Sequence, residues 1–449
     1  MFDVDVLREQ FPSVNRVCAV CPDCGGPMKL LQGRQGQFLG CGNYPKCSGV
    51  REITADDERV PIYLDGPGGT QVPQCVLDAM IRYLTTCNAN HGGVFTTSRE
   101  SDAILHEAHQ AAADLLNAPS PDEIVFGANM TTLTFHLSRA FGRTLQPGDE
   151  VLVTRQDHDA NVSPWVLAAR DAGATVRFVD IHPEDCTLDL DDLRRQLGPK
   201  VRLLAVTCAS NAVGTVNDVR QITRLAHDSG ALVYLDAVHY APHGLLDVQN
   251  WDCDFLACSA YKFFGPHVGI LWGRRELLAR LPAYKVRPAT EELPDRWMTG
   301  TQNHEGLAGV TAAVDYLASV GTSATAERPR RQRLEVAFRA IQNYERTLAD
   351  RLLDGLASRP RFRVWGITRR EQRVWRVPTV SLTAADRTPL QIAEHLASRE
   401  IYAWNGNMYA LELTERLGLE KRGGLLRLGL VHYNTLEEVE RLLQALDEL

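Results

Sequence analysis

A lysine and an aspartate follow two buried strand-like segments near the middle of the chain. Lys262 comes shortly after the apolar run 255–258, and Asp236 ends the apolar run 231–235. Burial lowers the pKa of a lysine because desolvation disfavours the charged form, and a neutral amine can form a Schiff base with an aldehyde. A carboxylate can keep a pyridine nitrogen protonated. The pair therefore predicts a pyridoxal 5'-phosphate (PLP) site, with Lys262 on the aldehyde carbon and Asp236 at the ring nitrogen.

Each of these residues has an ordinary structural explanation when taken alone. Lys262 would be a surface lysine at a strand end, and Asp236 would be a turn carboxylate or a helix cap. Their positions at consecutive strand ends, with a Gly265-Pro266 turn after the lysine, favour the cofactor site.

Four cysteines near the amino end have the spacing of a metal site. Cys21 and Cys24 form a C-x2-C pair, and after sixteen residues Cys41 and Cys47 form a C-x5-C pair. Two tight turns of this kind bring four thiolates into the tetrahedral arrangement of structural Zn²⁺, and so small a fold needs the metal for stability. The glycine-rich segment between the pairs predicts a β-hairpin. Free thiols are the alternative. Cys18 lies outside the pattern and is not expected to be a ligand.

Composition narrows the class of protein. The 449 residues are 44% hydrophobic and 23% charged, as in an ordinary globular protein of two or three domains. A net charge of −8 argues against a general nucleic-acid-binding surface, although a local basic module remains compatible with it. No apolar run is long enough to span a membrane. Eleven cysteines and an acidic start without a signal-peptide pattern predict a cytoplasmic protein with thiols and metal ligands.

The order of apolar segments predicts the organisation of the chain. Strand-like runs at 123–126, 150–154, 175–179, 202–207, 231–236 and 254–257 alternate with helical stretches, which predicts an α/β domain with a mainly parallel sheet. Long helices are expected at 303–319 and 327–357, followed by strands near 379–382 and 425–430. We expect residues 1–16 to form an amino-terminal helix over 2–12 that packs on the cofactor domains. Residues 17–58 would then be the inserted ribbon, 59–302 the large PLP-binding domain and 303–449 the small α+β domain.

Two resemblances follow from these motifs. Residues 20–50, with Cys-Pro-x-Cys-Gly and Tyr44-Pro45-x-Cys47, resemble the zinc ribbons of bacterial type I topoisomerases. The rest of the chain resembles class V aminotransferase-fold enzymes, in the branch of the cysteine desulfurase-like proteins. That likeness implies PLP-dependent transferase fold type I, with a mainly parallel seven-stranded sheet and a smaller carboxyl-terminal domain. The ribbon implies a possible protein or nucleic-acid partner, and few basic residues favour a structural or protein-docking role.

The family resemblance extends to residues around the cofactor. His158 is similar to the histidine that stacks on the pyridine ring, and Asn211 to an asparagine near the ring oxygen and the substrate. His239 stands where desulfurases usually carry a glutamine, and Tyr261 where they carry a histidine. The implied cofactor-binding set is Met130, Thr131, Thr132, His158, Asn211, Asp236, His239, Ser259, Tyr261, Lys262 and Thr301, with Lys262, Asp236 and His158 catalytic. For Thr131 the alternative is a simple helix cap.

The resemblance also predicts a substrate site and an assembly. Arg427 matches the arginine that binds the substrate carboxylate, for which a guanidinium suits both oxygens. The alternative is a surface arginine on an edge strand. Thr301, in Gly300-Thr301-Gln302-Asn303, matches a loop that reaches the phosphate of a partner subunit, which implies a homodimer with shared active sites. The predicted substrate-binding residues are Arg427, Asn211, His91, Phe95 and Tyr409.

The chain departs from the desulfurases at their reactive cysteine. Its last cysteine is Cys258, and Tyr409 falls near the expected place; Phe95 likewise replaces an active-site histidine. The chemistry that remains is an external aldimine with an amino acid, from which Lys262 removes the α-proton. We expect a C–S lyase or β-eliminase acting on a cysteine-derived substrate. The alternatives are a class V aminotransferase or epimerase, a desulfurase with a non-standard sulfur acceptor, and a non-catalytic binding protein that holds PLP and zinc.

Overall fold

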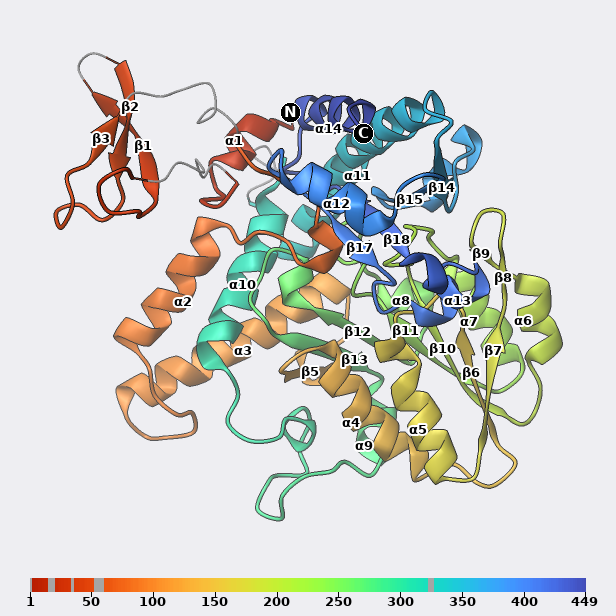
Figure 1. Ribbon diagram of the computed structural model, residues 1–449. Coiled ribbons are helices and arrows are strands. Elements are labelled where there is room, and N and C mark those ends of the chain that lie inside the picture. Colours follow the sequence, from red (N-terminus) through yellow and green to blue (C-terminus); the bar gives the residue numbers. More distant parts are fainter. Residues whose placement is uncertain (1, 15–20, 34–35, 52–59, 322–326) are drawn as a thin grey trace.

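The computed structural model describes residues 2–14, 21–33, 36–51, 60–321 and 327–449 (Figure 1). A seven-stranded sheet forms the centre of the larger part. Its strands lie in the order β5 (Ile124–Gly127), β13 (Gly269–Gly273), β12 (Phe255–Ser259), β11 (Leu232–Asp236), β10 (Val201–Thr207), β6 (Glu150–Thr154) and β7 (Thr175–Val179). Only β13 runs antiparallel to its neighbours, so the prediction of a mainly parallel α/β sheet is confirmed.

Side chains of the central strands alternate between two apolar layers, as the period of two in a strand requires. Leu204 and Val206 of β10 belong to one buried cluster, while Leu203 and Ala205 belong to the other. The first cluster is covered by α2 (Gln74–Thr86), α3 (Thr96–Leu116), α6 (Leu190–Gln196), α7 (Val219–Asp228), α8 (Val248–Trp251) and α10 (His304–Ser319). The second is covered by α4 (Met130–Gly142), α5 (Ser163–Asp171) and α9 (Arg275–Arg280).

Strand β13 is the element of this sheet that the sequence pattern did not predict. Its five residues are all buried and begin and end with glycine, so they show neither alternation nor a turn signal. A Cβ at Gly269 would lie 2.4 Å from the backbone carbon of Asn129. Glycine is therefore needed here because the strand passes directly against the start of α4.

A second sheet lies in the carboxyl-terminal part. Its antiparallel order is β14 (Phe362–Trp365), β15 (Thr379–Ala384), β18 (Leu425–Gly429) and β17 (Trp404–Gly406). The helices of this part are α11 (Arg330–Ala357), α12 (Pro389–Ala397), α13 (Leu411–Arg416) and α14 (Leu436–Asp447). Strands β15 and β18 and the helices α10 and α11 were predicted, whereas the short strands β14 and β17 were not.

Contacts between segments far apart in sequence bring the amino-terminal residues against the carboxyl-terminal part of the chain. Helix α1 (Val4–Arg8) is shorter than the predicted 2–12, because the chain leaves it through turns that end at Phe11. Arg8 forms an ion pair of 2.8 Å with Glu438, and Phe2 stacks on Tyr344, which brings the amino end beside α14 and α11 (Figure 1). Strand β4 (Ile62–Tyr63) pairs in parallel with β16 (Ile401–Tyr402).

The remaining elements are short. The ribbon is a three-stranded antiparallel sheet of β1 (Met28–Gly33), β2 (Gly36–Cys41) and β3 (Val50–Arg51), which confirms the predicted hairpin. Strands β8 (Ile181–His182) and β9 (Thr187–Leu188) form a separate pair. The 3-10 helices are η1 (Gly66–Gly68), η2 (Pro121–Glu123), η3 (Asp159–Asn161), η4 (Ala260–Lys262), η5 (Asp295–Trp297), η7 (Arg370–Trp375) and η8 (Glu420–Arg422). No helix among the described residues is long and apolar enough to cross a bilayer.

Candidate active site and zinc centre

The predicted cofactor residues follow the carboxyl ends of five strands that all run in the same direction. These are β5, β6, β10, β11 and β12, whose ends meet at one edge of the sheet. The residues that follow them are Met130 and Thr131, His158, Asn211, Asp236 and His239, and Ser259 and Lys262 respectively. Ligands of open α/β sheets bind outside this edge, because connecting loops there converge on one place.

Lys262 has the electrostatic surroundings of a reactive amine. Burial, together with the nearby Arg427 guanidinium, lowers its pKa to about 7, even though the carboxylates of Asp236 and Asp65 partly oppose the shift. Its Nζ donates a hydrogen bond to the carbonyl oxygen of Pro67 and lies 4.8 Å from the centre of the Tyr261 ring. A large fraction of this lysine is therefore neutral near pH 7.

Asp236 lies close enough to Lys262 for the two charges to interact. Burial raises the pKa of Asp236 to about 6, although a hydrogen bond of 2.9 Å from the Val238 amide and the charge of Lys262 already limit this rise. The carboxyl group is thus mostly ionised at neutral pH. A buried carboxylate in this state can hold a proton on a facing ring nitrogen.

His158 is a neutral ring at the same edge. Burial, helped by the charges of Lys262 and Arg427, lowers its pKa to about 4. Its Nδ1 accepts a hydrogen bond of 3.0 Å from the Ala160 amide, so the ring proton sits on Nε2. Tyr409 stacks on the imidazole with 5.4 Å between ring centres and an interplanar angle of 19°. The site therefore offers a flat aromatic surface without charge.

Arg427 and Asn211 carry buried polar atoms that have no partner. Arg427 donates to the carbonyl oxygen of Asn211 at 3.0 Å, and the Asn211 amide donates to the carbonyl oxygen of Met408 at 2.8 Å. Arg427 Nε and Asn211 Oδ1 are buried and form no hydrogen bond within the described residues. Because an unpaired buried polar atom is costly, these two atoms indicate where a bound ligand completes the site.

The start of α4 is arranged for an anion. Ser259 Oγ accepts a hydrogen bond of 3.0 Å from the Met130 amide, and Asn129 Oδ1 accepts one of 2.9 Å from the Thr132 amide. Thr131 lies between them and is exposed. A helix of 13 residues adds the positive end of its dipole here. Thr131 thus has the predicted position, while Ser259 and Asn129 serve the helix end itself.

Two predicted cofactor residues have further partners. Tyr261 stacks on His267 at 4.9 Å between ring centres. His239 Nε2 lies 3.0 Å from Thr379 Oγ1, and the charges of Arg427 and Lys262 contribute to lowering its pKa, after burial and His243.

Three predicted residues lie apart from Lys262. His91 and Thr301 line a cavity of about 450 Å³. Phe95 is exposed at the start of α3. Within the described ranges, none of the three forms a hydrogen bond or ion pair with Lys262, Asp236 or Arg427. Their assignment to the site stays a prediction that requires a second subunit.

Sequence reasoning did not select Asp65 and Asp157. Burial raises the pKa of Asp65 to about 6, although the charges of Arg427 and Lys262 limit the rise; its Oδ1 is buried and has no hydrogen-bond partner among the residues that the structure describes. Asp157 accepts hydrogen bonds from Thr154 and Asn161, and burial raises its pKa. Asp65 had a visible signal, since it precedes the Gly66-Pro67-Gly68-Gly69 turn directly after an apolar strand.

The four predicted zinc ligands come together in the ribbon. The Sγ atoms of Cys21, Cys24, Cys41 and Cys47 all lie within 4.8 Å of one another, with 3.8 Å between Cys21 and Cys47 and 3.5 Å between Cys24 and Cys41. A tetrahedral Zn²⁺ with bonds of about 2.3 Å needs sulfurs about 3.8 Å apart.

The backbone around these sulfurs also fits a metal site. A Cβ at Gly49 would lie 2.5 Å from Cys21 Sγ, so glycine is required where the chain passes the sulfur. The Asn43 amide donates to Cys41 Sγ at 3.4 Å, as expected for a thiolate ligand. Cys18 lies outside the described residues.

Comparison with known proteins agrees with this geometry. Residues 62–442 match the family "Aminotransferase class-V". The chain belongs to the class V aminotransferase family. Residues 19–55 match "Topoisomerase DNA binding C4 zinc finger". Both resemblances seen in the sequence are thereby confirmed.

Individual relatives point to one branch of this family. The chain is 35% identical to the aminotransferase-like protein FGM3 of Gibberella zeae, over 87% of this chain and 95% of that protein. It is 30% identical to a cysteine desulfurase of Serratia proteamaculans, over 86% and 93%. The solved Escherichia coli cysteine desulfurase CsdA is 25% identical, with a TM-score of 0.77 over 100% of this chain and 98% of that chain.

The protein is therefore a PLP-dependent, cysteine desulfurase-like enzyme with an amino-terminal four-cysteine zinc ribbon. The residues present fit the cofactor. Lys262 has an amine of low basicity, the start of α4 suits a phosphate, and Asp236 offers a buried carboxylate. Arg427 Nε and Asn211 Oδ1 have no hydrogen-bond partner among the described residues.

The pKa of Lys262 predicts how the apoprotein takes up PLP. The covalent attachment rate should rise with pH around a midpoint near 7, with about one tenth of the amine neutral at pH 6 and nine tenths at pH 8. Cofactor absorbance in a stopped-flow titration measures this rate. A midpoint near 10.5, the ordinary pKa of a lysine, would contradict the lowered pKa of Lys262. Because the unfolded chain binds the extra proton between about pH 7 and 10.5, this lysine's contribution to stability rises with pH in that window.

Proposed function

We propose that this enzyme is a PLP-dependent C–S lyase that eliminates the β-substituent of a cysteine-derived amino acid. The observation that carries the proposal is the grouping of a weakly basic Lys262 with Arg427 and Asp236, in a chain whose last cysteine is Cys258. Bound PLP supplies an electron sink for the electrons released at the substrate α-carbon.

Arg427 would bind the substrate carboxylate. It is buried on β18, and its unpartnered Nε gives the guanidinium an unused donor. Asn211 Oδ1 lies next to it as an unused acceptor, because Arg427 is bonded to the backbone of the same residue. Together they would fix the α-carbon in front of Lys262.

Lys262 would move the proton. As a neutral amine, Nζ takes the α-proton, and the resulting ammonium gives a proton to the departing sulfur. The C–S bond breaks, the sulfur leaves as a thiol, and addition of one water releases pyruvate and ammonia. Asp236, mostly ionised at neutral pH, would hold the protonated ring nitrogen of the cofactor, and His158 would supply an uncharged aromatic ring beside it.

Three buried cysteines of the large domain are poorly suited to sulfur transfer. Burial raises the pKa values of Cys208 and Cys253, and raises that of Cys258 likewise, so these thiols are poorly ionised. Tyr409 occupies the loop beside His158, and its phenol accepts no sulfur. The loop is held in place, since Met408 and Tyr409 both have φ of 57° and their carbonyl oxygens accept bonds from Asn211 and the Asp159 amide.

A substrate screen tests the proposal. Amino acids, free and S-conjugated, are incubated with the holoenzyme, and pyruvate, ammonia, thiol and keto-acid products are measured. Stoichiometric pyruvate, ammonia and thiol supports the lyase. A keto acid that retains the substrate side chain would show transamination in place of elimination. The name of the 35% identical relative, an aminotransferase-like protein, favours this alternative. An inverted α-carbon would indicate an epimerase, persulfide formation a desulfurase, and no product with any substrate a binding protein.

Arg427→Lys should weaken the enzyme without unfolding it. A lysine keeps the charge but loses the bidentate contact with a carboxylate. We therefore expect kcat/KM to fall roughly 30- to 1,000-fold, which corresponds to a loss of about 2 to 4 kcal/mol of transition-state stabilisation. The fall should appear mostly in KM for a carboxylate substrate. Arg339→Lys on the exposed face of α11 is the matched control. An unchanged KM would remove Arg427 from the substrate site.

We propose that the enzyme is a homodimer with shared active sites. Helix α2 exposes Leu77, Ile81 and Leu84 at spacings of four and three residues, which places them on one apolar stripe. The cavity that holds His91 and Thr301 has no lysine in its lining, so its partner groups would come from a second copy.

Ile81→Asp should therefore dissociate the dimer. A buried unpaired carboxylate costs at least about 2 kcal/mol per subunit, or about 4 kcal/mol per dimer, so the dissociation constant should rise about 10³-fold. Light scattering after size exclusion measures the mass. Leu390→Asp, at an equally exposed leucine of α12, should leave it unchanged. An identical mass for both variants would exclude the α2 stripe from the interface.

We propose that the ribbon is a structural or protein-docking module. Its described residues expose Lys29 and Lys46 but also Asp23, and Arg51 is only partly exposed. So few cations bind a phosphate backbone weakly.

A further inference from the structure

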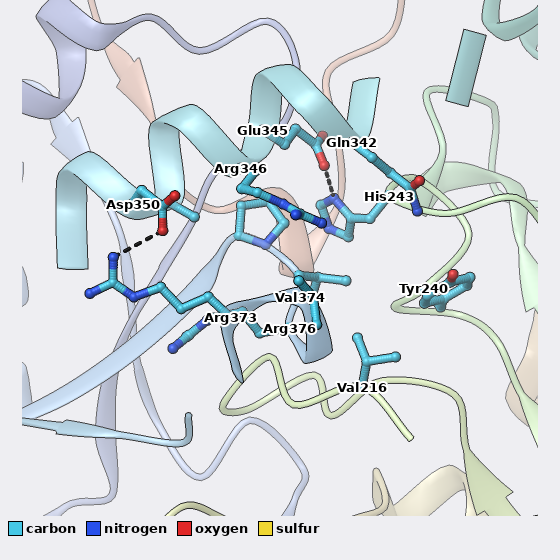
Figure 2. Close-up of a pocket in the computed structure, with 13 residues that line it drawn as sticks. Val216, Tyr240, His243, Gln342, Glu345, Arg346, Asp350, Arg373, Val374 and Arg376 are labelled. Carbon is cyan, nitrogen blue, oxygen red and sulfur yellow. Dashed lines mark hydrogen bonds and ion pairs between the residues drawn. The ribbon is translucent and has the colours of Figure 1, made fainter. Parts of the chain in front are cut away.

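A chain of buried polar side chains leads from helix α11 toward the active site. Glu345 Oε2 lies 2.8 Å from His243 Nδ1 (Figure 2), and both side chains are 2% exposed. The His243 ring packs edge to face against His239, with 5.5 Å between centres and an angle of 75°. His239 in turn lies 3.0 Å from Thr379 Oγ1 on β15. The charges of Arg427 and Lys262 act on His239, so this series of side chains ends at the predicted cofactor site.

Stability alone does not account for this arrangement. A buried ion pair is often no more stable than apolar side chains of the same volume, because desolvation offsets the attraction. Burial in addition raises the pKa of Glu345, and the interactions with His243 and with the His432 backbone only partly oppose this shift. The middle of α11 otherwise buries apolar residues such as Ile341 and Leu348. A carboxylate at this position therefore points to a role through His243.

His239 is the group on which the chain acts. Burial lowers its pKa well below the usual value, and the charges of His243, Arg427 and Lys262 lower it further. It is therefore a neutral ring that is hydrogen-bonded to Thr379 and packed edge to face against His243. The orientation of His243 depends on Glu345, since a carboxylate acceptor keeps the proton on Nδ1.

We propose that Glu345 is a positioning residue of the active site, which acts through His243 to fix the orientation of His239 beside the cofactor. This inference rests on the proposed function only in requiring PLP at Lys262. It assigns a role to the His239 position that does not depend on which amino acid is the substrate.

Other charged groups near the pair provide a control. A cavity of about 80 Å³ adjoins Glu345 and His243 and is also lined by Arg346, Asp350, Arg373 and Arg376 (Figure 2). Asp350 is bonded to Arg373 at 2.9 Å, one turn further along α11, and Arg376 donates to main-chain carbonyl oxygens. On the opposite side, His432 Nε2 lies 2.7 Å from Tyr316 Oη. Asp350 thus shares the helix and the cavity with Glu345 but has no bond to His243.

The test is a double-mutant cycle on the bound cofactor. Holoenzyme is prepared as wild type, Glu345→Gln, His239→Gln and the double variant, with Asp350→Asn as control. The pH midpoint of cofactor absorbance is measured without substrate, together with the melting temperature. We expect Glu345→Gln to move the midpoint by about 0.5 unit or more, about a threefold change in proton affinity. In the His239→Gln background the same change should move it by much less, and Asp350→Asn should not move it.

An equal shift in both backgrounds would overturn the proposal, because Glu345 would then act without His239. An unchanged midpoint with an intact fold would overturn it too. If Glu345→Gln does not fold, Glu345→Asp takes its place, because the shorter side chain withdraws the carboxylate from His243. The shift of the pH midpoint is again compared with and without His239→Gln. Failure of the wild type to bind PLP would instead contradict the proposed function.

Discussion

Replacing Lys262 with alanine is expected to abolish turnover and the covalent attachment of PLP. The amine both holds the cofactor aldehyde and moves the α-proton, and proton transfer alone contributes about 10²- to 10⁴-fold to a rate. Residual product formation should therefore fall at least about 10³-fold. The measurement is product release together with mass spectrometry after borohydride reduction, which marks a lysine joined to PLP.

The fold should survive this replacement. Lys262 has a lowered pKa because its burial is unfavourable to the charge, so alanine removes a cost and the melting temperature of the apoprotein should not fall. Lys200→Ala, at an exposed lysine before β10, should retain full activity and cofactor. A Lys262→Ala variant that still carries reducible PLP would show that another amine holds it.

Removing zinc is expected to unfold the ribbon while the catalytic part stays folded. The buried apolar cluster of the ribbon consists of Met28 and Leu39 with the cysteines Cys21 and Cys41. So small a core cannot offset the conformational entropy of about 30 residues. Binding of structural Zn²⁺ is worth about 10 to 16 kcal/mol in comparable small domains, and that free energy is also the folding free energy.

Cys21→Ser measures this effect directly. We expect loss of one zinc per chain by elemental analysis, and rapid proteolysis within residues 21–51. PLP content should stay at the wild-type level, because the ligands of the ribbon are separate from Lys262 and its neighbours. Cys75→Ser, at an exposed cysteine of α2, should keep its zinc. A Cys21→Ser variant that retains zinc and resists proteolysis would contradict the site.

The sequence predicted those parts of the protein that depend on residues close together in the chain. A C-x2-C pair and a C-x5-C pair each bring two thiolates close together in a short turn. The zinc ligands could therefore be predicted from their spacing, without knowledge of the fold. Lys262 and Asp236 were visible because parallel strands deliver their carboxyl ends to one edge, and both residues stand at such ends. The apolar run of β6 marked its bounds, since a strand buried on both faces contains few polar residues.

Long-range packing decided the rest. Strand β13 is set by the approach of its Gly269 to α4, more than a hundred residues away. Asp65 reaches Lys262 and Arg427 because β4 pairs with β16 at the other end of the chain. The Glu345–His243 contact has no pattern at all, since a helix sequence does not show which of its faces will meet a loop. Sequence by itself therefore determined the cofactor chemistry and the metal. The tertiary structure decided which charges surround Lys262, because burial and distance set a pKa and neither is a property of neighbouring residues in the chain.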